Sequence, residues 1–167
     1  MPLSPEALLA RLDAAGIEHR TVAHPPVFTV AESKALRPAL PGGHSKNLFL
    51  RPQKGEGPFL LVVLEEDRRV SVNALARSLG APRVAFGSPA ALVATLGVEP
   101  GSVTPFGLVN AGPGTVRPVF DRHLMQDFDW VNFHPLTNAM TTAIRPADLL
   151  RFLEQLGHRP ELADPPA

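Results

Sequence analysis

The chain contains no cysteine among its 167 residues. This absence excludes disulfides, thiol catalysis and thiolate metal sites, and it agrees with a reducing compartment. Histidine is present but scattered, at His19, His24, His44, His123, His134 and His158. No two of them have the spacing at which a helix presents a pair of metal ligands. The sequence therefore supports neither a metal site nor a cofactor.

An excess of charge of either sign is also lacking. Lysine and arginine together number 16, aspartate and glutamate together number 16, and the formal net charge is zero. Proteins that bind nucleic acids without specificity rely on a diffuse basic field, and this chain has none. Any polyanion that it binds must be held by local contacts.

No apolar run approaches the length of a membrane span, and the N-terminal segment has no basic stretch followed by an apolar one. We therefore expect a soluble cytoplasmic protein without a membrane partner. The length of 167 residues and the hydrophobic content of 44% suit one globular domain. We predict a single domain over residues 1–160, followed by a disordered tail over residues 161–167.

Proline and glycine divide the chain into helices and strands. Ser4 is expected to cap a helix that ends at Gly16, and Ser88 a helix that ends at Gly97. Two further helices are predicted, at 72–79 and from Pro146 to Gly157. The predicted strands cover 18–22, 47–50, 59–64, 83–86, a stretch around Leu108, 116–120, 130–133 and 139–144. Strands outnumber helices without regular alternation, which favours an α+β fold with a mixed, barrel-like sheet and surrounding helices.

The most informative segment runs from Gly42 to Leu50, because Lys46 and Asn47 lie where a loop leads into an apolar strand. A phosphate-binding loop is rejected here, since Lys46 follows Ser45 and the glycine spacing is wrong. A serine–lysine dyad is also rejected, because neighbours in an extended segment point to opposite faces. His44 and Lys46 are expected to share a face instead.

Four motifs, read in order, resemble the YbaK-like aminoacyl-tRNA editing domains over almost the whole chain. Within that family the chain looks most like the free-standing deacylases related to the insertion domain of prolyl-tRNA synthetase. Each motif alone is weak, but four in register are specific to the superfamily. The motifs are His24-Pro25-Pro26-Val27-Phe28-Thr29-Val30-Ala31-Glu32, Lys46-Asn47-Leu48-Phe49-Leu50, Gly101-Ser102-Val103-Thr104-Pro105-Phe106-Gly107 and Phe133-His134-Pro135-Leu136-Thr137-Asn138.

The resemblance implies roles for particular residues. Lys46 matches the critical lysine of the family, Gly101 opens its Gly-x-x-x-Pro loop, and His134 matches its histidine; these three are the candidate catalytic residues. An ammonium group at Lys46 suits a ribose-phosphate or ester group, and backbone N–H groups near Gly101 suit an oxyanion or carbonyl. The implied substrate-binding residues are Asn47, Ser102, Val103, Thr104, Pro105 and Phe133.

The same residues also have ordinary structural interpretations. Lys46 is then a solvated residue at a strand end, His134 a core histidine with a satisfied ring, and Gly101 a turn glycine after Pro100. For His24 we favour a loop-shaping role over catalysis. Phe28 and Phe49 are expected in the core rather than as platforms for stacking a terminal adenine.

The resemblance implies an enzyme that removes alanine mischarged onto proline tRNA by ester hydrolysis with an oriented water molecule. The implied partners are the 3′ end and acceptor stem of aminoacylated tRNA(Pro), with prolyl-tRNA synthetase or an elongation factor as helpers. Two alternatives stay open: the same chemistry on cysteine or serine esters, and a catalytically silent module that binds tRNA or a synthetase.

Overall fold

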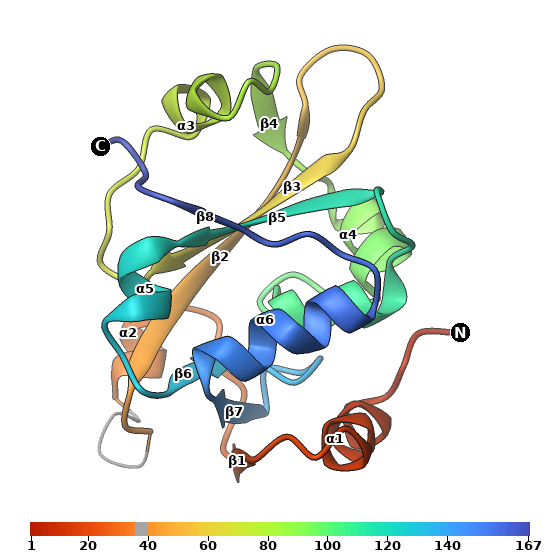
Figure 1. Cartoon of the computed structure of the whole chain (residues 1–167), viewed down its shortest axis with the longest axis vertical. Helices are drawn as coiled ribbons and strands as arrows, with labels where there is room; N and C mark the ends of the chain where they lie inside the picture. The colour runs from red at the N-terminus through yellow and green to blue at the C-terminus, as the bar shows by residue number, and fades with distance from the viewer. Residues whose placement is uncertain (36–39) are drawn as a thin grey trace.

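The computed structural model of the protein describes residues 1–35 and 40–167. Its centre is a mixed eight-stranded sheet (Figure 1) in which β4 (Val84–Phe86) pairs with β2 off the main path. In the described residues the two edge strands, β1 and β8, do not pair with each other, so the barrel-like sheet is open. The order along the path is β1 (His19–Ala23), β7 (Met140–Ile144), β6 (Val131–Phe133), β2 (Gly43–Pro52), β3 (Phe59–Glu65), β5 (Val116–Asp121) and β8 (Glu161–Ala163).

Several helices begin at a serine that caps them. The side chains of Ser4, Ser71 and Ser88 each accept a hydrogen bond from the backbone N–H three residues later, as N-caps do. No helix within the described residues is long and apolar enough to cross a membrane. The helical elements are α1 (Pro5–Ala14), α2 (Val30–Lys34), α3 (Val72–Ser78), α4 (Pro89–Leu96), the 3₁₀ helix η2 (Pro105–Asn110), α5 (Arg122–Gln126) and α6 (Pro146–Gln155).

Strand β3 is apolar from Phe59 to Leu64 because both of its faces are buried. Leu61 and Val63 belong to one hydrophobic cluster, which contains buried residues of α1, α4 and α6. Leu60 and Val62 belong to a second cluster, which contains buried residues of α3. β3 pairs antiparallel with β2 and parallel with β5, so the sheet is mixed, and the predicted α+β class is confirmed.

Strand β2 starts earlier than predicted, at Gly43 rather than Asn47. The extra residues extend because they pair in parallel with β6, where His44 lies opposite Asn132. Lys46 therefore lies inside a strand, opposite Leu64 of β3, and not at the end of a loop. This parallel pairing joins two segments that are distant in the sequence and brings β2 next to the segment that contains His134.

Two predicted elements are wrong. The stretch around Leu108 is the 3₁₀ helix η2 and not a strand, because Thr104 Oγ1 accepts from the N–H of Phe106 and Pro105 occupies the first helical position. Residues 161–163 form β8 instead of a disordered tail. This strand pairs with β5, and Arg117 Nη2 donates to Glu161 Oε1 at 2.9 Å.

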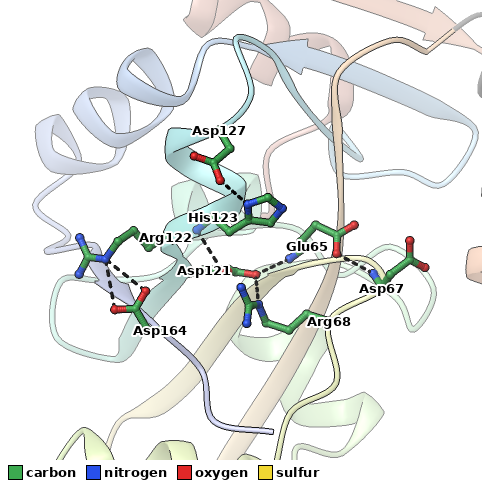
Figure 2. A network of polar contacts seen from close by, with 8 residues as sticks. All are labelled: Glu65, Asp67, Arg68, Asp121, Arg122, His123, Asp127 and Asp164. Carbon is green, nitrogen blue, oxygen red and sulfur yellow. Dashed lines mark hydrogen bonds and ion pairs between the residues drawn. The ribbon is translucent and has the colours of Figure 1, made fainter.

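A buried carboxylate joins the end of β3 to the start of α5 (Figure 2). Asp121 Oδ2 accepts from Glu65 N at 3.0 Å and from Arg68 Nε at 2.6 Å, while Asp121 Oδ1 accepts from His123 N at 3.1 Å. The last contact is the N-cap of α5. Asp121 is thus a structural residue that fixes three segments at one point.

Candidate functional site

A cavity of about 200 Å³ opens beside the N-terminal half of β2. Its walls come from the segment before α2, from β2, from the loop before η2, and from β6 and β7. Three of these segments are joined by strand pairing, since β6 pairs with both β2 and β7. The lining residues are Val27, Phe28, Thr29, His44, Ser45, Lys46, Asn47, Gly101, Val103, Asn132, Phe133, His134 and Thr141.

Lys46 contributes the cationic group of the cavity. Its side chain is half-buried, and within residues 1–35 and 40–167 it makes no ion pair or hydrogen bond. Lysine is seldom withdrawn from water without a partner. An unpaired ammonium at the wall of a polar cavity is therefore available to an anionic or strongly dipolar ligand.

His134 supplies a neutral imidazole. Its Nδ1 donates to the carbonyl oxygen of Met140 at 3.0 Å, so in the neutral ring Nε2 is an acceptor. Burial lowers the pKa of His134 below its ordinary value, the Met140 carbonyl opposes that shift, and electrostatic repulsion from the neighbouring His24 ring adds to it. The two imidazole rings lie 6.4 Å apart, centroid to centroid. His134 can therefore accept a proton or a hydrogen bond near neutral pH.

His24 is held between the turn and β7. Its Nδ1 donates to the Pro25 carbonyl and its Nε2 accepts from Thr141 Oγ1, each at 2.8 Å. Both ring nitrogens are therefore engaged. This arrangement fits the predicted loop-shaping role of His24, and it orients Thr141 at the cavity wall.

Asn132 closes the turn that precedes β2. Its Nδ2 donates to the carbonyls of Pro41 at 3.0 Å and Gly43 at 3.1 Å. Gly42 has φ +109°, and a Cβ there would lie 2.6 Å from the carbonyl oxygen of Trp130. The turn therefore requires glycine, and Asn132 fixes the position from which β2 starts.

Asn47 lines the cavity and has one buried amide atom without a partner among the described residues. Its Nδ2 donates to Ser45 Oγ at 3.2 Å, whereas its buried Oδ1 has no partner among the described residues. Buried polar atoms are usually hydrogen-bonded. This oxygen is buried, so it can accept from a ligand only after the Asn47 side chain moves.

Gly101 lies at the mouth of the cavity. Its φ is +90°, and a Cβ would meet Phe28 Cδ1 at 3.1 Å. The Phe28 side chain is 68% exposed, contrary to its predicted place in the core, whereas Phe49 is buried as predicted. The glycine therefore lets the chain adopt a left-handed conformation and lets an aromatic ring lie against it.

The structure brings together six of the nine residues predicted from the sequence. The other three are outside the cavity lining: Ser102 and Pro105 are buried, and Thr104 is occupied in capping η2. The cavity residues that sequence reasoning missed include His44, Asn132 and Thr141. The sequence could have indicated Asn132 as a site residue, because it is a polar residue between the apolar Val131 and Phe133. The six that meet are Lys46, Asn47, Gly101, Val103, Phe133 and His134.

Carboxylates gather only outside the cavity in the described part of the chain. Ligand atoms of Glu65, Glu66 and Asp67 lie within 4.8 Å of one another. Asp67 pairs with Lys34 at 2.7 Å, and Glu65 Oε2 accepts from the backbone N–H of Asp67. These contacts give the group a structural role, and we assign no metal to it.

Comparison with known proteins identifies the family. Residues 24–152 match the model of the aminoacyl-tRNA editing domain. The chain belongs to this family. The matched range contains the whole cavity lining, so the cavity is a feature of the editing domain itself.

Several relatives of this editing domain match it over nearly its full length. Prolyl-tRNA synthetase associated domain-containing protein 1 of Bos taurus is 40% identical, with 92% of this chain and 91% of the relative covered. Prolyl-tRNA editing protein ProX of Acetoanaerobium sticklandii is 31% identical, with 92% of each chain covered. A solved structure described as a candidate trans-editing enzyme for prolyl tRNA synthetase shares the fold, with a TM-score of 0.73, 21% identity and 99% of each chain covered.

Proposed function

We propose that this editing domain is a hydrolase that deacylates mischarged Ala-tRNA(Pro). The observation that carries the proposal is the cavity, in which an unpaired lysine and a neutral histidine face the same small space. Membership of the editing-domain family and the likeness to ProX support the reaction class and the tRNA.

The reaction needs no covalent nucleophile, because an aminoacyl ester is already activated. A water oxygen bonds to the ester carbonyl carbon, the bond from that carbon to the ribose oxygen breaks, and the ribose oxygen takes a proton. Holding water and ester in a reactive geometry supplies much of the acceleration, and the neighbouring ribose hydroxyl assists. The protein's task is therefore to orient the ester and to stabilise the charge that develops on its carbonyl oxygen.

Three residues divide this task. The Lys46 ammonium holds the ribose-phosphate or ester group, and the backbone at Gly101 faces the ester carbonyl. His134 Nε2 accepts a hydrogen bond from the amino group of the substrate or from the attacking water.

Selectivity for alanine follows from size. A synthetase site built for proline cannot strongly reject a smaller residue, because missing methylene groups change the discrimination by only about 1–3 kcal/mol. A second site that admits alanine and excludes proline removes the error. Val27, Val103 and Phe133 supply apolar surface to the cavity for this purpose.

The test is single-turnover deacylation of Ala-tRNA(Pro), run beside Pro-, Ser- and Cys-tRNA(Pro). We expect rapid loss of alanine and retention of proline. Lys46→Ala is expected to slow the reaction about 10- to 100-fold, the range for a charge-assisted contact of roughly 1.5–3 kcal/mol. A Lys46→Ala enzyme as fast as the wild type would contradict the assigned site.

Gly101 has a matched control elsewhere in the chain. Gly114 also has a positive φ, of +85°, but a Cβ there meets nothing within 4 Å. Gly101→Ala and Gly114→Ala should therefore suffer similar backbone strain, while only Gly101→Ala should lose activity. Wild-type protein that binds the tRNA without hydrolysing any of the four esters would instead support the silent binding module.

A further inference from the structure

Two guanidinium groups lie over the indole ring of Trp130. Arg20 Cζ lies 4.2 Å from the centroid of the indole ring, and Arg145 Cζ lies 4.5 Å from it. Arg20 is exposed, and the side chain of Arg145 keeps 48% of its surface accessible. We call this group the Arg20–Trp130–Arg145 stack. It presents two cations on a rigid aromatic support while each keeps part of its hydrogen-bonding capacity.

The stack lies on the same face of the sheet as the cavity. Arg20 is paired with Ala143 across β1 and β7, and Ala143 is paired with Asn132 across β7 and β6. Paired residues of adjacent strands project to the same face. Arg20 therefore shares its face with Asn132, which lines the cavity. Two strand spacings separate them, or roughly 10 Å.

The connection to the cavity is also direct along the chain. Trp130 lies two residues before Asn132, and its carbonyl oxygen accepts from Gly43 N at 2.8 Å, in the turn that starts β2. Arg145 lies four residues after Thr141, another cavity residue. The same turn and strands thus position both the stack and the cavity, so their separation is fixed.

The chemistry of the stack matches a phosphodiester. Guanidinium groups recognise phosphate oxygens through paired N–H donors, and stacking on an aromatic ring orients them in advance. Glu18 accepts from Arg145 Nη1 at 2.8 Å and holds that side chain in place. The chain has no net charge, so RNA must be held by a local group such as this one.

We propose that the Arg20–Trp130–Arg145 stack binds backbone phosphates of the RNA near its 3′ end while the aminoacyl ester occupies the cavity. This inference rests on the proposed function, because the cavity determines which part of the RNA lies nearby. A cation–π contact alone would not support this inference, because such contacts occur roughly once per 70–80 residues in proteins. The position of two guanidiniums on one ring, on the face of the cavity, carries it.

Binding of an uncharged RNA hairpin with a CCA 3′ end tests the inference without requiring catalysis. We expect Arg20→Ala/Arg145→Ala to raise the Kd about 10- to 100-fold. The slope of log K against log salt concentration should become shallower by about 1.4, since each phosphate contact to a single strand contributes about 0.7. The control is Arg77→Ala/Arg83→Ala near α3 and β4, at the opposite end of the molecule from β1 (Figure 1), where we expect no change in Kd.

A substrate without phosphates separates this inference from the proposed function. Alanine esterified to adenosine should be hydrolysed equally by wild type and by Arg20→Ala/Arg145→Ala, whereas Ala-tRNA(Pro) should be hydrolysed more slowly by the variant. Equal loss on both substrates, or an unchanged Kd for the hairpin, would overturn the inference and leave the stack a purely structural feature. Failure of the wild type to hydrolyse either ester would refute the proposed function, while the hairpin Kd would still decide the role of the stack.

Discussion

At the scale of single residues, the protonation state of His134 predicts how the deacylation rate depends on pH. Burial is the main cause that lowers its pKa from the ordinary value of 6.5, so the ring is neutral at pH 7 and protonates only at more acidic pH. If Nε2 accepts a hydrogen bond during the reaction, protonation removes that acceptor. We expect the enzymatic deacylation rate, corrected for spontaneous hydrolysis, to be insensitive to this ring above pH 7 and to fall below pH 6.5.

The variant His134→Gln tests whether this ring is responsible for the acid limb. We expect a rate about tenfold lower at pH 7, less than the roughly 100-fold minimum usual for a general base because Gln can still accept a hydrogen bond, and a flatter profile below pH 6.5. His123→Gln is the matched control, because His123 is exposed on α5 and pairs with Asp127. An acid limb that survives unchanged in His134→Gln would show that a group other than His134 is responsible for it.

At the scale of secondary-structure elements, Asp121 is the residue on which the junction of β3 and α5 depends. Its carboxylate is fully buried and accepts three hydrogen bonds, one of them from Arg68 (Figure 2). Asp121→Ala leaves these donors unpaired. We expect it to lower the free energy of unfolding by roughly 3 kcal/mol, the lower end for a broken buried pair because the Arg68 side chain is 31% exposed.

The control for Asp121 is its neighbour in the same figure. Arg122 pairs with Asp164 at 3.4 Å, and both side chains are exposed, so Arg122→Ala should change the free energy of unfolding by less than about 1 kcal/mol. Urea denaturation followed by circular dichroism measures both variants. Equal effects of the two variants would show that the buried network adds nothing beyond a surface ion pair.

The elements also show what the sequence could predict. Local signals sufficed for the longer helices, since Ser4 and Ser88 cap α1 and α4 as expected and α6 begins at Pro146, but the five-residue helices α2 and α5 were not predicted. Pairing between distant segments did not have a local signal. β8 is a strand because β5 offers it a partner, and β2 extends to Gly43 because β6 lies beside it.

The candidate site likewise combines residues that local motifs predict with residues that only strand pairing brings in. The motif residues Lys46, Gly101 and His134 were predicted and do line one cavity. Asn132 and Thr141 join them through the pairings of β6 with β2 and β7, which no local pattern reveals. Thr104 and Pro105 belong to the predicted loop motif but serve to start η2, because a motif does not distinguish residues that contact a ligand from residues that shape the loop.

At the scale of the whole molecule, β3 couples the two hydrophobic clusters. Its residues alternate between them, with Leu61 and Val63 in the larger cluster and Leu60, Val62 and Leu64 in the smaller one. If β3 detached from one cluster, apolar side chains of the other cluster would also become exposed. The prediction of a single domain therefore becomes a prediction of one cooperative unfolding transition.

Leu75 of α3 and Trp130 before β6 allow that prediction to be measured. Leu75 is buried in the smaller cluster. Trp130 is the single tryptophan in a chain without tyrosine, and it contacts Arg20 of β1 and Arg145, which directly follows β7. Leu75→Ala should lower the free energy of unfolding by about 2–4 kcal/mol. It should shift the urea midpoint of Trp130 fluorescence as far as that of circular dichroism, whereas Val93→Ala, at a residue 39% exposed, should shift neither. If the fluorescence midpoint of Leu75→Ala stayed at the wild-type value while the circular dichroism midpoint fell, the two clusters would unfold separately and the chain would contain two domains.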